Sequence, residues 1–395
     1  MATYIKKVLI GTSIAASITT LSTSAAFATG LTRPTNIQFT TNGVANTSAP
    51  NINSWNYAPG AAVYDNTGIG GVNRQVLNDY SNKGSISKAT AALTDNDRTT
   101  NVELFTSGET VTDHVGFTAN LGKNTIKIES VTKADWADGT LATGWLTGFR
   151  DTYGGLMSGI TTTPGSNMLK DFNSNFTSLV SYLSTNGFNA AGDPNIGDVS
   201  YNQATKDLKI DLVGHLDLSP TIVDTRKTVI DTRATIIDTR KTIVVSGKTV
   251  ANPTYNKSIP NPTYNKSVTN PNYLGVSPDF SRNSTGNVVF DTMLFKLAKT
   301  ALEQNTPFQF SEIAKVNFNN QVSYAYGFSA VDSGAIAGDR AATDTTSHTG
   351  IYSWTKNYKN YQTAPVPEPS ALIGLMAIGG LVVARRKGRK NVSFE

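Results

Sequence analysis

Residues 115–128 read VGFTANLGKNTIKI, and they carry the clearest fold signal in the chain. Apolar side chains alternate with polar ones on both sides of a Gly-Lys-Asn turn, namely Val115, Phe117, Ala119, Leu121, Ile126 and Ile128. Successive side chains of a β-strand point to opposite faces, so the apolar residues of each strand share one face. The segment therefore predicts an antiparallel β-hairpin with one face buried in a core.

Helical periodicity follows further along the chain. From Met168 to Ser184, apolar residues recur every three or four positions, which predicts an amphipathic helix packed on a sheet. Its ends carry matching signals, with a capping residue at Ser166 or Asn167 and a glycine, Gly187, suited to the left-handed position that ends a helix.

The remaining body repeats these patterns. The expected elements are short strands with long loops over 31–79, a Gly-rich packed loop over 144–159, a hairpin of 199–201 with 208–212, a helix from Asp291 to about Leu302, and strands over 308–316 and 321–330 around Asn319 and Asn320. Strands on both sides of two helices predict a β-rich α+β fold, with one antiparallel-sheet domain and two packed helices. Residues 29–217 form its first part and residues 276–355 its second.

The predicted insertion at 218–275 consists of repeats. A seven-residue unit, TIVDTRK, begins at Thr221 and recurs with small changes to residue 248, and an NPTYNKS unit then occurs twice. Adjacent β-branched residues exclude a coiled coil and favour extended chain. Because seven is odd, a continuous strand would swap faces at every repeat, so we expect bends at Asp-Thr-Arg or an exposed ribbon. The Pro-containing units read as a linker or edge strand.

From Thr221 to Tyr273 the chain holds eight cations and three Asp, a net charge of +5. One hypothesis is that this segment projects and contacts anionic exopolysaccharide or the acidic body of a neighbouring molecule. The alternative is an expanded tract without a binding role.

The N-terminus has the pattern of a signal peptide over residues 1–28. Lys6 and Lys7 precede an apolar run, and Ala26 and Ala28 supply the small residues at −3 and −1 that signal peptidase requires. We expect cleavage after Ala28, which makes signal peptidase the first processing partner.

The C-terminal end combines three different pieces after a linker at 356–366. Prolines keep the stretch before Ser370 extended, residues 371–384 carry no charge, and five cations follow. A helix over 371–384 would be about 21 Å long, short of the roughly 30 Å hydrocarbon core. The terminal cations nevertheless favour a transmembrane helix of the inner membrane, because they would be held at its cytoplasmic headgroups.

This order of pieces resembles the PEP-CTERM sorting signal over 367–390. The resemblance implies that an exosortase recognises Pro367, Glu368 and Pro369 and cuts the chain. It also implies a cytoplasmic stop formed by the terminal cations, which are Arg385, Arg386, Lys387, Arg389 and Lys390. A Pro-rich linker before a plain tail anchor is the alternative. The expected localisation is exported, transiently anchored in the inner membrane, and then at the cell surface or extracellular.

Composition excludes several function classes. The chain has a formal charge of +5, but without the signal peptide and the tail from Val366 its 27 cations (34 − 2 − 5) match 27 anions (29 − 2). The net positive charge of the chain therefore comes from its two targeting segments, so nucleic-acid binding is not expected. The chain has no Cys, which excludes disulfides and Cys-based metal or nucleophile sites.

No catalytic or cofactor site is predicted. His114, His215 and His348 lack partners at metal-ligand spacing. Asp95 and Asp97 lie in an oxygen-rich loop that partly resembles a Ca²⁺ loop, but without its Gly and final Glu, so no metal site is assigned there.

A vaguer resemblance concerns the body. DPNI at 193–196 with GHLD at 214–217, and YAYGFSA at 324–330 with SHTG at 347–350, are similar to a function-unknown PEP-CTERM family of photosynthetic bacteria. This resemblance implies no activity.

Two functions remain open. The favoured one is a non-enzymatic envelope or extracellular-matrix protein. The alternative is a secreted carbohydrate-active enzyme or carbohydrate-binding module, with candidate stacking platforms at Trp55, Trp136, Trp145 and Trp354.

Overall fold

The computed structural model describes residues 30–46, 52–57, 64–65, 74–79, 85–104, 112–188, 191–280, 284–337 and 346–359. The predicted signal peptide at 1–28 and the predicted sorting signal at 367–390 lie outside the described residues.

The larger of two body sheets has ten strands in the order β20-β22-β11-β10-β7-β4-β6-β21, with β1 paired to β10 and β5 to β6. Its strands are β1 (Leu31–Thr32), β4 (Ile52–Tyr57), β5 (Tyr64–Asp65), β6 (Arg74–Asp79), β7 (Asn101–Leu104), β10 (Asn195–Asn202), β11 (Asp207–Gly214), β20 (Val331–Asp332), β21 (Ala335–Ala337) and β22 (Gly350–Asn357). All described pairings in it are antiparallel except that of β21 with β6. The hairpin predicted around residues 202–207 is confirmed by β10 and β11.

The second sheet has six strands in the order β19-β18-β9-β8-β2-β3. They are β2 (Thr35–Thr41), β3 (Val44–Ala45), β8 (Val115–Leu121), β9 (Asn124–Ser130), β18 (Ala314–Phe318) and β19 (Gln321–Ala325). The predicted hairpin is confirmed by β8 and β9, and Gly122 takes a φ of 66° in the turn, where a side chain would be strained.

One core joins the two sheets. Phe117 and Ile128 of the second sheet and Val102 and Ile210 of the first are all buried in the same cluster. Short helix α1 (Ile86–Ala92) adds Ala89 and Ala92 to it. Alternation along the strands therefore determines which residues fill this core.

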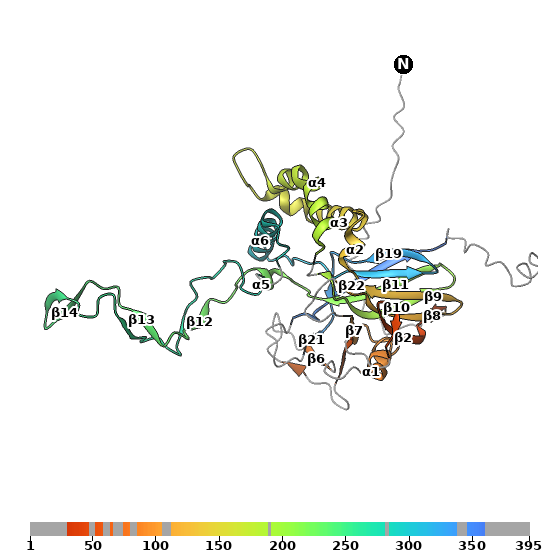
Figure 1. Ribbon diagram of the computed structural model, residues 1–395, viewed down its shortest axis with the longest axis horizontal. Coiled ribbons are helices and arrows are strands. Elements are labelled where there is room, and N and C mark those ends of the chain that lie inside the picture. Colours follow the sequence, from red (N-terminus) through yellow and green to blue (C-terminus); the bar gives the residue numbers. More distant parts are fainter. Residues whose placement is uncertain are drawn as a thin grey trace, which may run out of the picture.

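A second core lies among helices. It is built by α3 (Thr140–Gly159), α4 (Met168–Asn186) and α6 (Val288–Glu303), with the short helices α2 (Lys133–Trp136) and α5 (Ser219–Ile222) at its margin. Figure 1 shows these helices gathered on one side of the sheets. Trp145 lies at the centre, 5.3 Å from the Phe149 ring and 5.4 Å from the Phe188 ring.

The prediction of a packed loop over 144–159 is wrong, because these residues lie in α3. Three long helices therefore form in the described residues, where two were expected. The glycines suggested a loop, but in α3 they allow aromatic side chains to pack closely against the helix. A Cβ on Gly148 would lie 2.6 Å from the ring of Phe328, and one on Gly144 would lie 3.2 Å from the hydroxyl of Tyr326. Because glycine has no Cβ, Phe328 and Tyr326 can approach the helix this closely.

The helix predicted from Met168 is confirmed as α4, and Asn167 caps it by accepting a bond from Lys170 N at 3.0 Å. Gly187 follows with a φ of 75° but a ψ of −173°, so it is not in the left-handed helical conformation expected there. The expected packing on a sheet is also wrong. Phe172 of α4 instead faces Phe149 of α3, with ring centroids 6.1 Å apart.

The second predicted helix is confirmed as α6, which begins at Val288 after the Asn287 cap. Asn319 and Asn320 form the predicted turn, both with positive φ. The strand predicted over 308–316 forms only from Ala314, and the one over 321–330 ends at Ala325. Residues just before β18 leave the sheet because Phe308 and Phe310 pack into the helical core.

Segments on both sides of the repeats enter the same sheets. From the later segment, β18 pairs with β9 and β22 pairs with β11, over residues 207–214 and 350–357. The repeats between them leave the body after α5 as a long, thin arm (Figure 1).

Candidate functional site

We call the segment Thr221–Tyr273 the arm; beyond the end of α5 at Ile222 it is a two-stranded ribbon built from short antiparallel pairs. The pairs are β12 (Thr228–Ile230) with β17 (Ser267–Thr269), β13 (Thr235–Ile237) with β16 (Ser258–Pro260), and β14 (Thr242–Val245) with β15 (Lys248–Ala251). The predicted exposed ribbon is confirmed. Its strands are interrupted at each Asp-Thr-Arg, and the bend falls on the following residue, at Lys227, Ala234 and Lys241. The Pro-containing units are the returning strand of that ribbon.

The two strands of the arm repeat with different lengths. Thr228, Thr235 and Thr242 begin successive outgoing pieces seven residues apart, and their partners Thr269, Pro260 and Ala251 are nine residues apart. The two extra residues form a turn in each returning unit. Asn256 and Asn265 take the left-handed conformation there, with φ of 57° and 55°, which Asn tolerates better than most residues.

One buried Asp closes each unit. Asp231 Oδ2 accepts bonds from Asn261 Nδ2 at 2.9 Å and from Thr263 Oγ1 at 2.8 Å. Asp238 has the same two partners in Asn252 and Thr254, at 2.9 and 2.7 Å. Each Asp thus ties the outgoing strand to the returning one at a fixed point.

The third Asp, Asp224, bonds to Asn270 at 2.9 Å. Asn270 begins a third, decayed copy of the nine-residue unit, NPNYLGVSP, which the sequence analysis missed. The nine-residue spacing of Asn-Pro-x-Tyr was the signal that would have revealed it. Here Leu274 occupies the left-handed turn position, with a φ of 60°, where the other copies have Asn.

Each Asp also binds the Arg two residues later through both carboxylate oxygens. For Asp231 and Arg233 the two bonds are 2.9 and 2.8 Å long. The arm's own loop atoms cover the carboxylate, although no large core is near it, and the Arg remains exposed. The hydrogen bond from Arg233, then those from Asn261 and Thr263, hold the pKa of Asp231 well below its usual value.

These pairs decide which charges the arm offers to a partner. Asp224, Asp231 and Asp238 neutralise Arg226, Arg233 and Arg240, respectively. The net charge of +5 therefore resides on five exposed lysines: Lys227, Lys241, Lys248, Lys257 and Lys266.

Apolar side chains are exposed along the same ribbon. Tyr255, Tyr264 and Tyr273 recur every nine residues and are 39%, 46% and 41% exposed, and Ile230 and Ile237 recur every seven residues at 57% and 55%. Tyrosines and lysines thus repeat together along one exposed ribbon.

We expect the arm to resist mild acid and to loosen only at low pH. The folded-state pKa of each arm Asp is lowered, so its contribution is complete above the unfolded pKa of about 3.9 and is lost as pH falls through the folded value. Side-chain amide NMR signals of Asn252, Asn261 and Asn270 should persist through pH 4 and broaden only below it. In Asp231→Ala, the Asn261 signal should be lost already at pH 7 while the Asn252 signal remains. Loss of all three signals near pH 4 in the unchanged chain would contradict this account.

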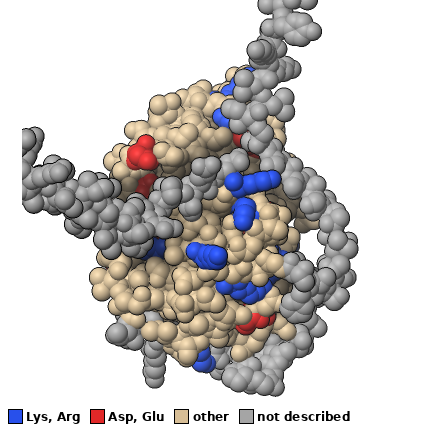
Figure 2. All heavy atoms as spheres, turned by 90° about the vertical axis from the view of Figure 1, so that its right-hand side faces the viewer, with Lys and Arg blue, Asp and Glu red and all other residues tan. Residues whose placement is uncertain are grey.

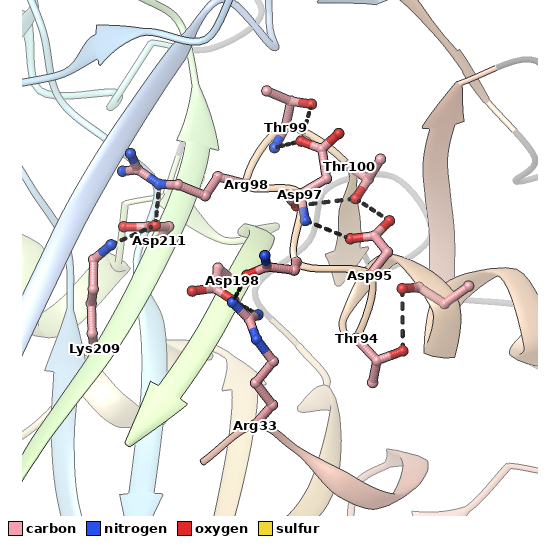
Figure 3. A network of polar contacts seen from close by, with 12 residues as sticks. Arg33, Thr94, Asp95, Asp97, Arg98, Thr99, Thr100, Asp198, Lys209 and Asp211 are labelled. Atoms are coloured by element: carbon pink, nitrogen blue, oxygen red, sulfur yellow. Dashed lines mark hydrogen bonds and ion pairs between the residues drawn. The ribbon is translucent and has the colours of Figure 1, made fainter. Parts of the chain in front are cut away.

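Asp95 and Asp97, the candidate Ca²⁺ ligands, lie in the polar network of Figure 3. Asp95 accepts bonds from Asp97 N at 2.9 Å and Thr100 Oγ1 at 2.7 Å, and Asp97 accepts two from Thr99. Burial raises the pKa of Asp95 more than these bonds lower it. The described residues contain no group of three or more His, Cys, Asp or Glu that could hold a metal ion. Backbone and hydroxyl donors of the same loop bind both carboxylates.

The rest of the network attaches this loop to the first sheet. Arg98 Nε donates to the buried Asp211 at 2.5 Å, and Lys209 Nζ lies 3.0 Å from the same oxygen (Figure 3). Burial alone would raise the pKa of Asp211, but the bond from Arg98 and the charges of Lys209 and Arg98 outweigh it and lower the pKa. Arg33 similarly pairs with Asp198. These contacts attach the loop and β1 to the first sheet.

Each of the three histidines contacts a different partner. His114 Nδ1 lies 3.0 Å from Ser130 O, His215 Nδ1 lies 3.0 Å from Thr346 Oγ1, and the His348 ring packs on Trp55 with centroids 4.3 Å apart. Three of the four candidate stacking tryptophans are buried, namely Trp55, Trp136 and Trp145. Trp354 alone of the four is partly exposed. Burial thus removes most of the aromatic surface proposed for a carbohydrate-active body.

No helix among the described residues is both long enough and apolar enough to span a bilayer. The predicted apolar segments at 8–21 and 371–384 lie outside that part of the chain.

Comparison with known proteins finds one similarity. Residues 365–390 match the PEP-CTERM protein-sorting motif, and the match does not extend into the body. No curated protein and no solved structure matches the chain. The matched motif marks an exported protein that is membrane-associated before an exosortase processes it.

Proposed function

We propose that this protein is a non-enzymatic component of the cell envelope or extracellular matrix, and that its arm binds anionic exopolysaccharide. The observation that carries the proposal is the set of five exposed lysines left on the arm once each Arg is neutralised by its Asp. The body outside the arm has 19 cations and 24 anions, a net charge of −5, so the arm carries the excess of positive charge in the exported chain.

Geometry supports a polymeric ligand. Successive units are separated by seven residues of outgoing strand, which span at most about 25 Å. A lysine-and-tyrosine site thus recurs along the ribbon at intervals that one long anionic chain can bridge. Each contact is weak at an exposed site, and several on one polymer reinforce each other.

Retention on immobilised alginate, compared with neutral dextran, tests the proposal. Replacing the five arm lysines by Gln should weaken alginate binding about tenfold or more and flatten its salt dependence. The matched control removes five cations elsewhere, at Lys88, Lys133, Lys170, Lys296 and Lys299, and should bind alginate nearly as well as the unchanged chain. Deletion of residues 221–273 should abolish retention. Unchanged, salt-independent retention after that deletion would refute the proposal.

A further inference from the structure

A second basic surface lies at the end of the body opposite the arm. Two turns, at residues 121–124 and 202–207, meet the end of β22 there, at residues 356–359. Tyr358 N donates to Lys206 O at 2.8 Å, and Asn357 Nδ2 donates to Thr205 O at 2.9 Å. A Cβ on Gly122 would lie 2.6 Å from Nε2 of Gln203, so the first turn lies against the second.

The segments 121–124, 202–207 and 356–359 contain four lysines, Lys123, Lys206, Lys356 and Lys359. Their single acidic residue is Asp207, so their net charge is +3. Lys123 and Lys359 are exposed, and Lys206 and Lys356 are partly exposed. Asp207 is engaged by Asn357 Nδ2 at 2.6 Å. Figure 2, which views the molecule from the side away from the arm, shows Lys and Arg predominating over Asp and Glu. We call the four lysines the basic face.

The direction of β11 shows where the basic face lies relative to the arm. β11 begins next to the turn at 202–207 and runs to Gly214, after which α5 leads into the arm. The basic face and the arm therefore lie at opposite ends of β11. Figure 1 shows the arm, with β12, β13 and β14, extending from one side of the body.

The chain leaves the described body from the basic face itself. Lys359 is the last described residue, and residues 360–370 separate it from the uncharged segment that begins at Ala371. Eleven residues span at most about 40 Å, so an anchored chain holds this end of the body close to the membrane.

We propose that the basic face docks on anionic lipid headgroups while the chain is still anchored, so that the arm points away from the membrane. Each lysine near an anionic surface favours the docked state about fivefold, and the attraction fades within about 8 Å at physiological salt. Loss of three of these lysines should therefore weaken docking about a hundredfold. This proposal does not depend on what the arm binds.

Because the chain has no Cys, single-cysteine labelling needs no background substitutions. The full chain, carrying a donor dye at Ala204→Cys beside the basic face or at Thr249→Cys near the arm tip, is bound to vesicles containing a lipid-linked acceptor. Energy transfer from position 204 should be high in vesicles with phosphatidylglycerol and fall sharply in pure phosphatidylcholine or at high salt. Transfer from position 249 should stay low in both.

The decisive variant combines Lys123→Gln, Lys206→Gln and Lys359→Gln, and its control combines Lys133→Gln, Lys170→Gln and Lys299→Gln. Only the first should lose transfer from position 204, while both keep the unchanged circular dichroism spectrum. Equal transfer from positions 204 and 249, or no effect of the first variant, would overturn the proposal. So would failure of the full chain to float with either vesicle, since docking requires the anchor. If the first variant loses alginate retention but keeps its energy transfer, the face is a polysaccharide site and the lipid proposal is wrong.

Discussion

Replacing Pro367, Glu368 and Pro369 by three alanines should stop C-terminal processing almost completely. The chain should then accumulate in the membrane fraction with its last residues intact, and its released form should fall to near zero. The expected reason is chemical, because prolines disfavour a helix and remove backbone donors, and Glu368 is the only charged residue between Lys359 and Arg385. Mass spectrometry of the C-terminus in envelope and medium measures the result directly.

The matched control is Pro365→Ala with Val366→Ala, which changes the adjacent residues and leaves the tripeptide in place. It should be processed normally. In cells without the exosortase, the unchanged chain should show the same intact C-terminus as the tripeptide variant. Normal release of the tripeptide variant would mean that these residues are not the recognition element.

Trp145→Ala should be the most damaging single change in the body, lowering the free energy of unfolding by about 3–5 kcal/mol. Trp145 is 0% exposed, and its ring lies within 6.2 Å of the rings of Phe149, Phe188, Phe290, Phe310 and Phe328. Its removal leaves a large cavity where α3 meets α6 and the segments before β18 and after β19. Urea denaturation followed by circular dichroism measures the loss.

Trp354→Ala is the comparison, because Trp354 lies only partly buried at the margin of the core between the sheets. It should cost clearly less than Trp145→Ala. A loss at Trp145 equal to or below that at Trp354 would show that the helical core contributes little to the stability of the body.

Several elements follow from local patterns alone. Alternation around Gly122 predicted β8 and β9, helical spacing predicted α4 and α6, and the odd seven-residue repeat predicted the exposed ribbon of the arm. In each case the signal lies in neighbouring residues, because a strand or an amphipathic helix selects its buried face with a fixed short period. The motif at 365–390 is likewise recognised from the order of its residues alone, with no need of the fold.

Other features depend on residues far apart in the chain. Gly144 and Gly148 looked like loop residues until Tyr326 and Phe328, more than 170 positions later, were found against them. The tryptophans looked equally suited to binding, and only packing buried Trp55, Trp136 and Trp145.

The sequence by itself thus determined the sorting motif, the strand and helix periods, and the net charge of the arm. Tertiary structure decided that seven residues pair with nine, and that each arm Asp, besides its Arg two residues later, binds an Asn of the returning strand. It also placed the basic face and the arm at opposite ends of β11. The physical reason is that a period is a property of neighbours along the chain, whereas strand pairing and burial belong to contacts that exist only once distant segments have met.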